Sequence, residues 1–222
     1  MPVGVPRVPF RIPGDEDASW LDIYNRLYRQ RSLFLGQRVD SAISNHLMGL
    51  MVYLTLEDST EDLYLFINSP GGWIVSGLAL FDMMQTVEPH VQTVCIGVAA
   101  SMACFVLVGG ETTKRTAFPH AWVMMHQPIG DLLPKTKSGD YLMEMNEVIR
   151  LYYSCVKTYA KITLKPGWVV YRDMHRDAFM TTEEAQAHGL VDLIGIDPDK
   201  SLEYPDKNLE YPDKNLENLE YK

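Results

Sequence analysis

The least polar part of the chain is the stretch 91–110, VQTVCIGVAASMACFVLVGG, which carries no charged residue. Its length matches the roughly 20 apolar residues that span a bilayer, so a transmembrane helix is one interpretation. The order of residue types favours another. Residues typical of strands lead into Gly97, three small residues end at Ser101, and a second apolar run is closed by Gly109 and Gly110. This pattern predicts a buried strand, a tight turn at the serine and a short buried helix.

Helical spacing and short apolar runs alternate through the rest of the chain. Apolar residues three and four apart predict helices at 41–56, 73–86 and 139–162. The short runs have the length of strands, and they lie at 31–35, 63–67, 121–125 and 190–194. Two shorter helices are expected, one from Pro166 to near His175 and one that starts at the capping box Thr181–Glu184 and stops at Gly189. Strands and helices in alternation predict an α/β fold.

The helix predicted at 139–162 carries an apolar seam, formed by Leu142, Met145, Ile149, Tyr152, Val156 and Tyr159. Its spacing alternates between three and four residues, as in a coiled coil. A contact with another subunit and packing on the chain's own sheet both fit this seam, so both interpretations stay open.

The two ends of the chain differ from its middle. Four prolines among the first thirteen residues predict an extended arm over residues 1–18. This arm lacks the apolar core of a secretory signal and the Arg/Ser-rich pattern of a transit peptide, so neither is expected. The segment 197–222 contains LEYPDKN twice and is rich in charge and proline, which predicts a disordered tail. A single domain is therefore expected over residues 19–196.

Composition narrows the class of protein. The net charge of −9, without a Lys/Arg cluster, argues against a nucleic-acid surface. A hydrophobic fraction of 46% and a charged fraction of 22% are ordinary for a soluble globular protein, so no membrane insertion is expected. The cysteines Cys95, Cys104 and Cys155 show no C-x-x-C spacing, which predicts buried free thiols and no metal site. No G-x-x-x-x-G-K-[ST] motif occurs, so the chain itself is not expected to bind nucleotide.

Ser101 stands at the predicted strand-to-helix turn, which is where α/β hydrolytic enzymes expose a nucleophile. The sequence around Ser101 does not match the G-x-S-x-G motif, and most serines at helix starts are only N-caps. A nucleophile and an N-cap therefore both stay open as interpretations. A nucleophilic serine needs a base, and the candidates are His46, His90, His120, His126, His175 and His188. His126 is favoured because it ends a predicted strand, and strand ends at one edge of an α/β sheet converge.

No spacing rule selects the carboxylate that would orient this histidine. The candidates are Asp131, Asp140, Asp173, Asp177 and Asp192. An oxyanion hole needs two backbone N–H groups aimed at one point. The N–H of Met102 could supply one, and Gly71 or Gly72 after Pro70 could supply the other, although a plain turn is the stronger interpretation of Pro-Gly-Gly taken alone.

Four separated motifs occur in the order found in Clp protease proteolytic subunits. They are NSPGG at 68–72, GVAASM at 97–102, VMMHQP at 123–128 and RDAFM at 176–180. The chain resembles this family over about residues 10–196, and its opening MPVGVPRVPF resembles the plastid-encoded form. The resemblance implies the crotonase-like α/β superhelix, with residues 141–162 as a handle helix between rings.

The resemblance also implies roles for individual residues. Ser101 would be the nucleophile, His126 the general base and Asp177 its orienting acid, with the N–H groups of Gly71 and Met102 as the oxyanion hole. An unfolded peptide would bind as an added strand along residues that include Gly72, Trp73, Ile74 and Pro128, and along the stretch after Pro128. Tyr64 and Phe66 would lie near the docking pockets for an unfoldase.

The partners implied by the resemblance are the other subunits of stacked seven-membered rings, unfolded proteins, and a hexameric AAA+ unfoldase that uses the ATP. No cofactor and no metal are implied for this chain. The implied location is the chloroplast stroma, with the bacterial cytoplasm as the alternative. A catalytically weak or structural ring subunit and an acyl-CoA enzyme on the same fold are the competing hypotheses.

Overall fold

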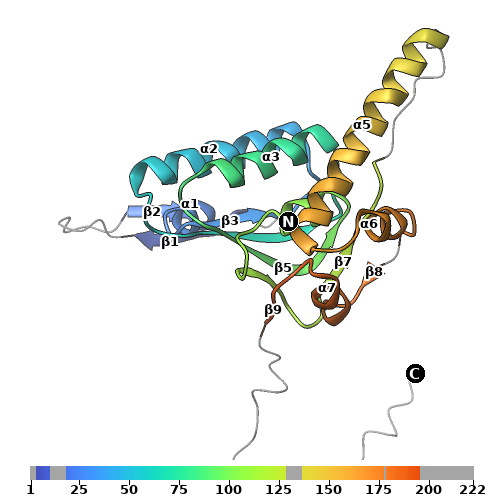
Figure 1. Cartoon of the computed structure of the whole chain (residues 1–222). Helices are drawn as coiled ribbons and strands as arrows, with labels where there is room; N and C mark the ends of the chain where they lie inside the picture. The colour runs from blue at the N-terminus through green and yellow to red at the C-terminus, as the bar shows by residue number, and fades with distance from the viewer. Residues whose placement is uncertain (1–3, 11–18, 129–136, 178, 196–222) are drawn as a thin grey trace, which may run out of the picture.

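The computed structural model describes residues 4–10, 19–128, 137–177 and 179–195. Its centre is a seven-stranded sheet in the order β3-β4-β5-β6-β9, in which β7 also pairs with β5 and β8 pairs with β7 (Figure 1). The strands are β3 Ser32–Leu35, β4 Leu63–Ser69, β5 Val91–Ala100, β6 Arg115–Ala117, β7 Trp122–Met124, β8 Phe179–Met180 and β9 Leu193–Ile194. Every pairing in this sheet is parallel except that of β7 with β8.

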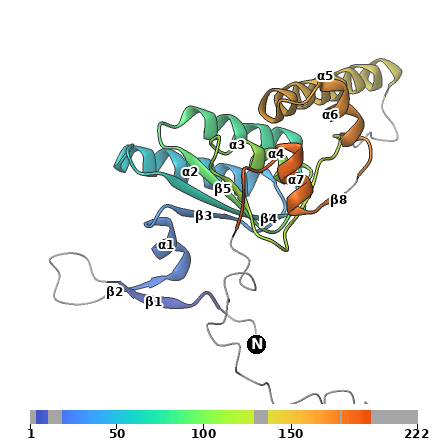
Figure 2. The ribbon, with the colours of Figure 1, turned by 60° about the horizontal axis from the view of Figure 1, so that its bottom comes forward.

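The first half of the chain supplies one helical layer and a small outlying unit. Helices α2, Ser41–Glu57, and α3, Ile74–Thr86, cover one face of the sheet (Figures 1 and 2). Helix α2 begins where predicted, because Asp40 Oδ1 accepts a hydrogen bond of 3.0 Å from the N–H of Ile43 and so caps the first turn. On the other side of β3 lie β1, Arg7–Phe10, β2, Ser19–Asp22, and α1, Ile23–Tyr28 (Figure 2).

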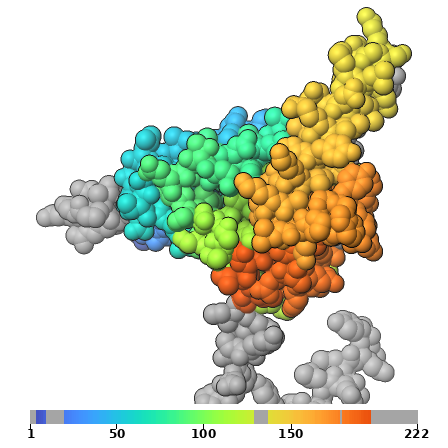
Figure 3. Space-filling model, in the orientation of Figure 1, coloured from blue at the N-terminus to red at the C-terminus, as the bar shows by residue number. Residues whose placement is uncertain are grey.

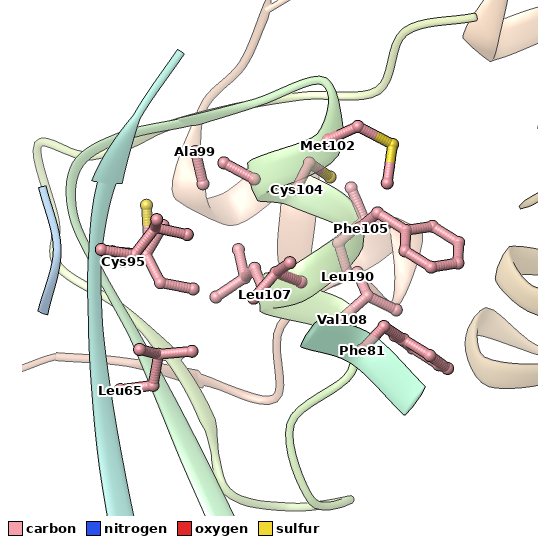
Figure 4. Close-up of a cluster of buried hydrophobic side chains, with 14 of the residues drawn as sticks. Leu65, Phe81, Cys95, Ala99, Met102, Cys104, Phe105, Leu107, Val108 and Leu190 are labelled. Atoms are coloured by element: carbon pink, nitrogen blue, oxygen red, sulfur yellow. The ribbon is translucent and has the colours of Figure 1, made fainter. Parts of the chain in front are cut away.

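Helix α4, Met102–Val108, is the centre of the core, and all seven of its residues are buried. Figure 4 shows this helix with Leu65 and Cys95 of the sheet on one side and Phe81 of α3 on the other. The Phe105 ring lies 4.7 Å from that of Phe81 and 5.3 Å from that of Tyr159, centroid to centroid. Fully burying a side chain of this size contributes about 1.5–3 kcal/mol, so the packing holds α4 firmly behind β5.

The last three helices follow β7. Helix α5, Ser138–Thr163, projects far from the body of the molecule (Figures 1 and 3), and only its second half contributes buried residues, from Tyr152 to Thr163. It is followed by α6, Gly167–Met174, and α7, Thr182–His188. The capping box predicted for α7 is present, since Thr181 and Glu184 each accept a hydrogen bond from the backbone N–H of the other.

The α/β class is confirmed, and so is the division of 91–110 into strand, turn and buried helix. Within the described residues, no helix combines the length and apolar character needed to cross a membrane. The pair β1/β2 and the short strands β6 and β8 were not predicted. Residues 7–10 of the predicted arm pair with β2, whereas the tail at 197–222 lies outside the described residues.

Candidate active site

Ser101 occupies a strained turn between β5 and α4. Its backbone has φ 53° and ψ −122°, a positive φ that a residue with a side chain rarely adopts and that costs about 1–3 kcal/mol. Its N–H donates to the Met124 carbonyl of β7 at 2.9 Å. The side chain makes no capping hydrogen bond to α4. Ser101 therefore does not cap α4 with its side chain, and its hydroxyl is available for another role.

Parallel pairing of β5 with β7 brings His126 to this turn. Ala100 is paired with Met124, so Ser101 comes one residue after one strand end and His126 two residues after the other. The carboxyl ends of parallel strands share one edge of a sheet, which is the reasoning that favoured His126 from the sequence. Its side chain is 16% exposed, so most of the imidazole is shielded from water.

Antiparallel pairing of β7 with β8 brings Asp177 to His126. Val123 is paired with Met180 and Met124 with Phe179, so continuing the register by two residues sets Asp177 across from His126. His126 Nε2 lies 3.2 Å from Asp177 Oδ1. Asp177 has φ 49°, a second strained backbone at this site, and its side chain is 60% exposed.

Among the described residues, the other candidate acids pair with other side chains or lie in α5. Asp173 lies 3.0 Å from His188 Nε2; burial alone would raise the pKa of Asp173, but hydrogen bonds from His188 and Arg172 outweigh it and lower that pKa. Asp192 is paired with Arg115. Asp140 is in the first turn of α5, and Asp131 lies outside the described residues.

Gly71 places its backbone against the serine turn. It has φ +90°, and a Cβ added there would lie 2.5 Å from the Ala100 oxygen and 2.9 Å from the Met102 nitrogen. No residue but glycine fits this approach. The Met102 N–H, at the first position of α4, has no partner within its own helix. The Gly71 N–H donates to Ser69 Oγ at 3.2 Å, a long bond between neighbouring groups of the same turn.

The backbone of Gly72 is extended, and one of its two edges is bridged to Val39. Val39 donates to the Gly71 carbonyl at 2.9 Å and accepts from the Trp73 N–H at 2.8 Å, in a parallel bridge between Val39 and Gly72. In such a bridge the N–H and C=O of Gly72 itself point to the opposite side. Ile74 is already the first residue of α3, so the extended edge ends at Trp73, whose side chain is 59% exposed.

The predicted residues still to be placed are Pro128, Tyr64 and Phe66. Pro128 is half-buried two residues beyond His126, and the stretch after it, 129–136, lies outside the described residues. Tyr64 and Phe66 point from β4 to the face opposite that of the buried Leu65, where the ring of Phe66 stacks on Phe34 at 5.2 Å. The described residues contain no group of three or more His, Cys, Asp or Glu side chains that could hold a metal ion.

The other five histidines contact other side chains or lie in a turn. His90 pairs with Glu111 and His188 with Asp173, while His175 Nδ1 lies 3.0 Å from the Tyr152 hydroxyl. His46 packs edge-on against Tyr28, and His120 follows Pro119 between β6 and β7. Among the described residues, His126 is thus the imidazole that the sheet brings to the Ser101 turn.

Fold and site together define an α/β protein whose candidate site lies where the strands of a mostly parallel sheet end. The family model described as Clp protease matches residues 15–197. The chain is 60% identical over 197 residues to the ATP-dependent Clp protease proteolytic subunit of Spinacia oleracea, covering 89% of this chain and 100% of that protein. The proteins of the same name from Helianthus annuus and Lactuca sativa match with the same identity and coverage. The chain belongs to the Clp protease family, and its membership supports a proteolytic function.

Proposed function

We propose that the chain is the proteolytic subunit of an ATP-dependent Clp protease and cleaves unfolded proteins as a serine endopeptidase. The observation that carries this proposal is the turn at Ser101, held in a strained conformation beside a His126–Asp177 contact of 3.2 Å. A hydroxyl, an imidazole and a carboxylate in that succession are the parts needed to activate a serine.

In the proposed reaction, Ser101 Oγ attacks the carbonyl carbon of a peptide bond while His126 takes the hydroxyl proton. Asp177 holds one ring nitrogen of the imidazole, which leaves the other for the serine. The negative charge that develops on the carbonyl oxygen is stabilised by the N–H groups of Met102 and Gly71. The C–N bond then breaks, and His126 gives its proton to the leaving amine.

Hydrolysis of the acyl-enzyme completes the cycle. Water gives a proton to His126 as it attacks the ester carbon, and the Ser101 oxygen takes that proton back when the C–O bond breaks. During acylation the Gly71 N–H gives up its 3.2 Å hydrogen bond to Ser69 Oγ and donates to the substrate oxygen instead. A charged acceptor forms the stronger bond, so this exchange favours the transition state.

The substrate is proposed to bind as a strand added to the free edge of Gly72. The N–H and C=O of Gly72 face away from Val39, and main-chain pairing of this kind accepts any extended peptide. The exposed Trp73, with Ile74 and Pro128, would then contact substrate side chains. Such backbone binding suits an enzyme that degrades unfolded chains of many sequences.

The proposed assembly consists of stacked seven-membered rings with an AAA+ unfoldase docked on them, located in the chloroplast stroma. The family membership and the plant relatives support it, since their names give them as subunits of an ATP-dependent protease. The partly exposed aromatic side chains of Tyr64 and Phe66 are the proposed contact for the unfoldase. The unfoldase would supply ATP hydrolysis, and this chain would need neither cofactor nor metal.

The proposal is tested in assembled core particles in which this chain is the only subunit with an intact nucleophile. With unfoldase and ATP present, an unfolded probe such as casein should be cut to short peptides. Ser101→Ala should abolish this cleavage, whereas Ser41→Ala, at an exposed serine in the first turn of α2, should leave it unchanged. Equal cleavage by both variants contradicts the role of Ser101. Assembled particles in which the unmodified chain cleaves nothing point instead to a structural ring subunit.

A further inference from the structure

Strand β5 contains a bulge just before the serine turn. Ile67 is paired with Cys95, and Ser69 is paired with Ala99. Three residues of β5, 96–98, therefore lie opposite the single residue Asn68 of β4. A bulge of this kind bends the strand that carries it and redirects the residues on its carboxyl side.

The side chain of Asn68 spans this bulge. Asn68 Oδ1 accepts a hydrogen bond of 3.2 Å from the Val98 N–H. Gly97 has φ +90°, and a Cβ added there would lie 2.8 Å from the same oxygen. Glycine thus supplies both the backbone conformation and the room for the amide to reach Val98.

The bulge lies where β5 changes neighbours. Residues Thr93–Cys95 of β5 pair with β6. Residues Val98–Ala100 of β5 pair with β7, the strand that leads to His126. Val98 comes three residues before Ser101, and Asn68 comes three residues before Gly71. The Asn68–Val98 bond therefore joins the segment that carries the serine to the segment that carries the neighbouring glycine.

We propose that Asn68 is a positioning residue for the reaction assigned above, which sets Ser101 relative to His126 and Gly71 by holding the β5 bulge. This inference rests on the proposed function of Ser101. Asn68 is exposed, so water can replace its oxygen at Val98 when the side chain is removed. The fold then persists while the bulge loses its fixed shape. A misplacement of about 1 Å at reacting atoms costs on the order of 100-fold in rate.

The test measures how fast a fluorophosphonate labels this chain in the assembled particle, together with kcat and KM for a short peptide. Asn68→Leu removes the acceptor, and Asn68→Asp keeps an oxygen at the same place. The matched control is Gln92→Leu, which removes a 2.7 Å bond from Gln92 Nε2 to Asp62 at the far end of β5. We expect Asn68→Leu to lower the labelling rate and kcat by about 10- to 100-fold with KM unchanged. Asn68→Asp should restore most of the rate, and Gln92→Leu should match the unmodified chain.

Two results overturn the inference. One is equal labelling of Asn68→Leu and Gln92→Leu, and the other is an Asn68→Asp variant as slow as Asn68→Leu. Should Asn68→Leu fail to assemble, Asn68→Ser gives the same comparison, because its shorter side chain cannot span the bulge. An unmodified chain that is not labelled at Ser101 overturns the proposed function as well. Normal labelling of the unmodified chain with fast Asn68→Leu overturns the role of Asn68 alone.

Discussion

His126 and Asp177 face each other across the antiparallel pair of β7 and β8, with 3.2 Å between Nε2 and Oδ1. The register of two short strands thus decides which acid meets the histidine. Both residues lie just outside their strands, so the contact depends on the pairing of Met124 with Phe179.

Replacement of Asp177 by asparagine should leave the particle assembled and lower kcat. The amide removes the negative charge that orients and stabilises the protonated imidazole, so we expect a loss of about 10²- to 10⁴-fold with little change in KM. Asp140→Asn, in the exposed first turn of α5, is the matched control. Steady-state cleavage of a short peptide measures both constants. If the two variants had equal kcat, Asp177 would not be the orienting acid.

Gly71→Ala should lower peptide cleavage, because the added methyl group would collide with the turn at Ser101. The new Cβ would meet the Ala100 oxygen at 2.5 Å and the Met102 nitrogen at 2.9 Å, at a φ of +90°. Loss of one oxyanion donor costs about 10²- to 10³-fold in kcat. Gly36→Ala is the control, because nothing lies within 4 Å of a Cβ at that position. Peptide cleavage by Gly71→Ala at the Gly36→Ala rate would exclude Gly71 from the site.

The Arg115–Asp192 ion pair should make the free energy of unfolding fall as the solution is acidified. Arg115 Nε donates to Asp192 Oδ2 at 2.8 Å, and the Arg115 side chain is 5% exposed. Burial alone would raise the pKa of Asp192, but the hydrogen bonds and charge of Arg115 outweigh it, so that pKa is lowered. Because the pKa is lower in the folded state, the stabilisation is present at neutral pH and is lost as pH falls through the folded-state pKa.

Thermal unfolding of Asp192→Asn measures this contribution across the pH range. At neutral pH the variant leaves a buried guanidinium without its counter-charge, and we expect a loss of about 3–5 kcal/mol. The difference from the unmodified chain should shrink as the solution is acidified. A difference that stays constant down to the acid range would show that the charge of Asp192 does not contribute.

The three thiols should be unreactive in the folded chain. Burial raises the pKa of Cys95 and of Cys104 to about 12 and that of Cys155 to about 11. The thiolate is the reactive form, so iodoacetamide at a pH of about 8 should modify none of them before unfolding and all of them in denaturant. Mass spectrometry counts the adducts. Rapid modification of the folded chain would contradict the burial of these cysteines.

The parts of the fold that depend on local pattern were predictable from the sequence. The strand, turn and helix expected at 91–110 and the helix expected at 41–56 depend on neighbouring residues alone, and these predictions are confirmed. Strands β6 and β8 have three and two residues, too few to show a hydrophobic period.

The residues of the candidate site likewise include some that local pattern could predict and some that it could not. Sheet-edge reasoning favoured His126, because it needs only the end of a predicted strand. Asp177 could not be chosen by such reasoning, since its place depends on the register of β7 with the unpredicted β8. The approach of Gly71 to the Met102 nitrogen likewise depends on the three-dimensional placement of two turns. Only the resemblance to the family selected Asp177 in advance and chose Gly71 rather than Gly72.

The most direct test identifies the residue that forms a covalent adduct and asks whether the adduct requires His126. The assembled particle is treated with a fluorophosphonate, and the modified peptide of this chain is sequenced by mass spectrometry. We predict one adduct, on Ser101, that is absent from Ser101→Ala and nearly absent from His126→Ala. An adduct on another residue, or full labelling of Ser101 when His126 is replaced, would contradict the assignment of Ser101 as a nucleophile activated by His126.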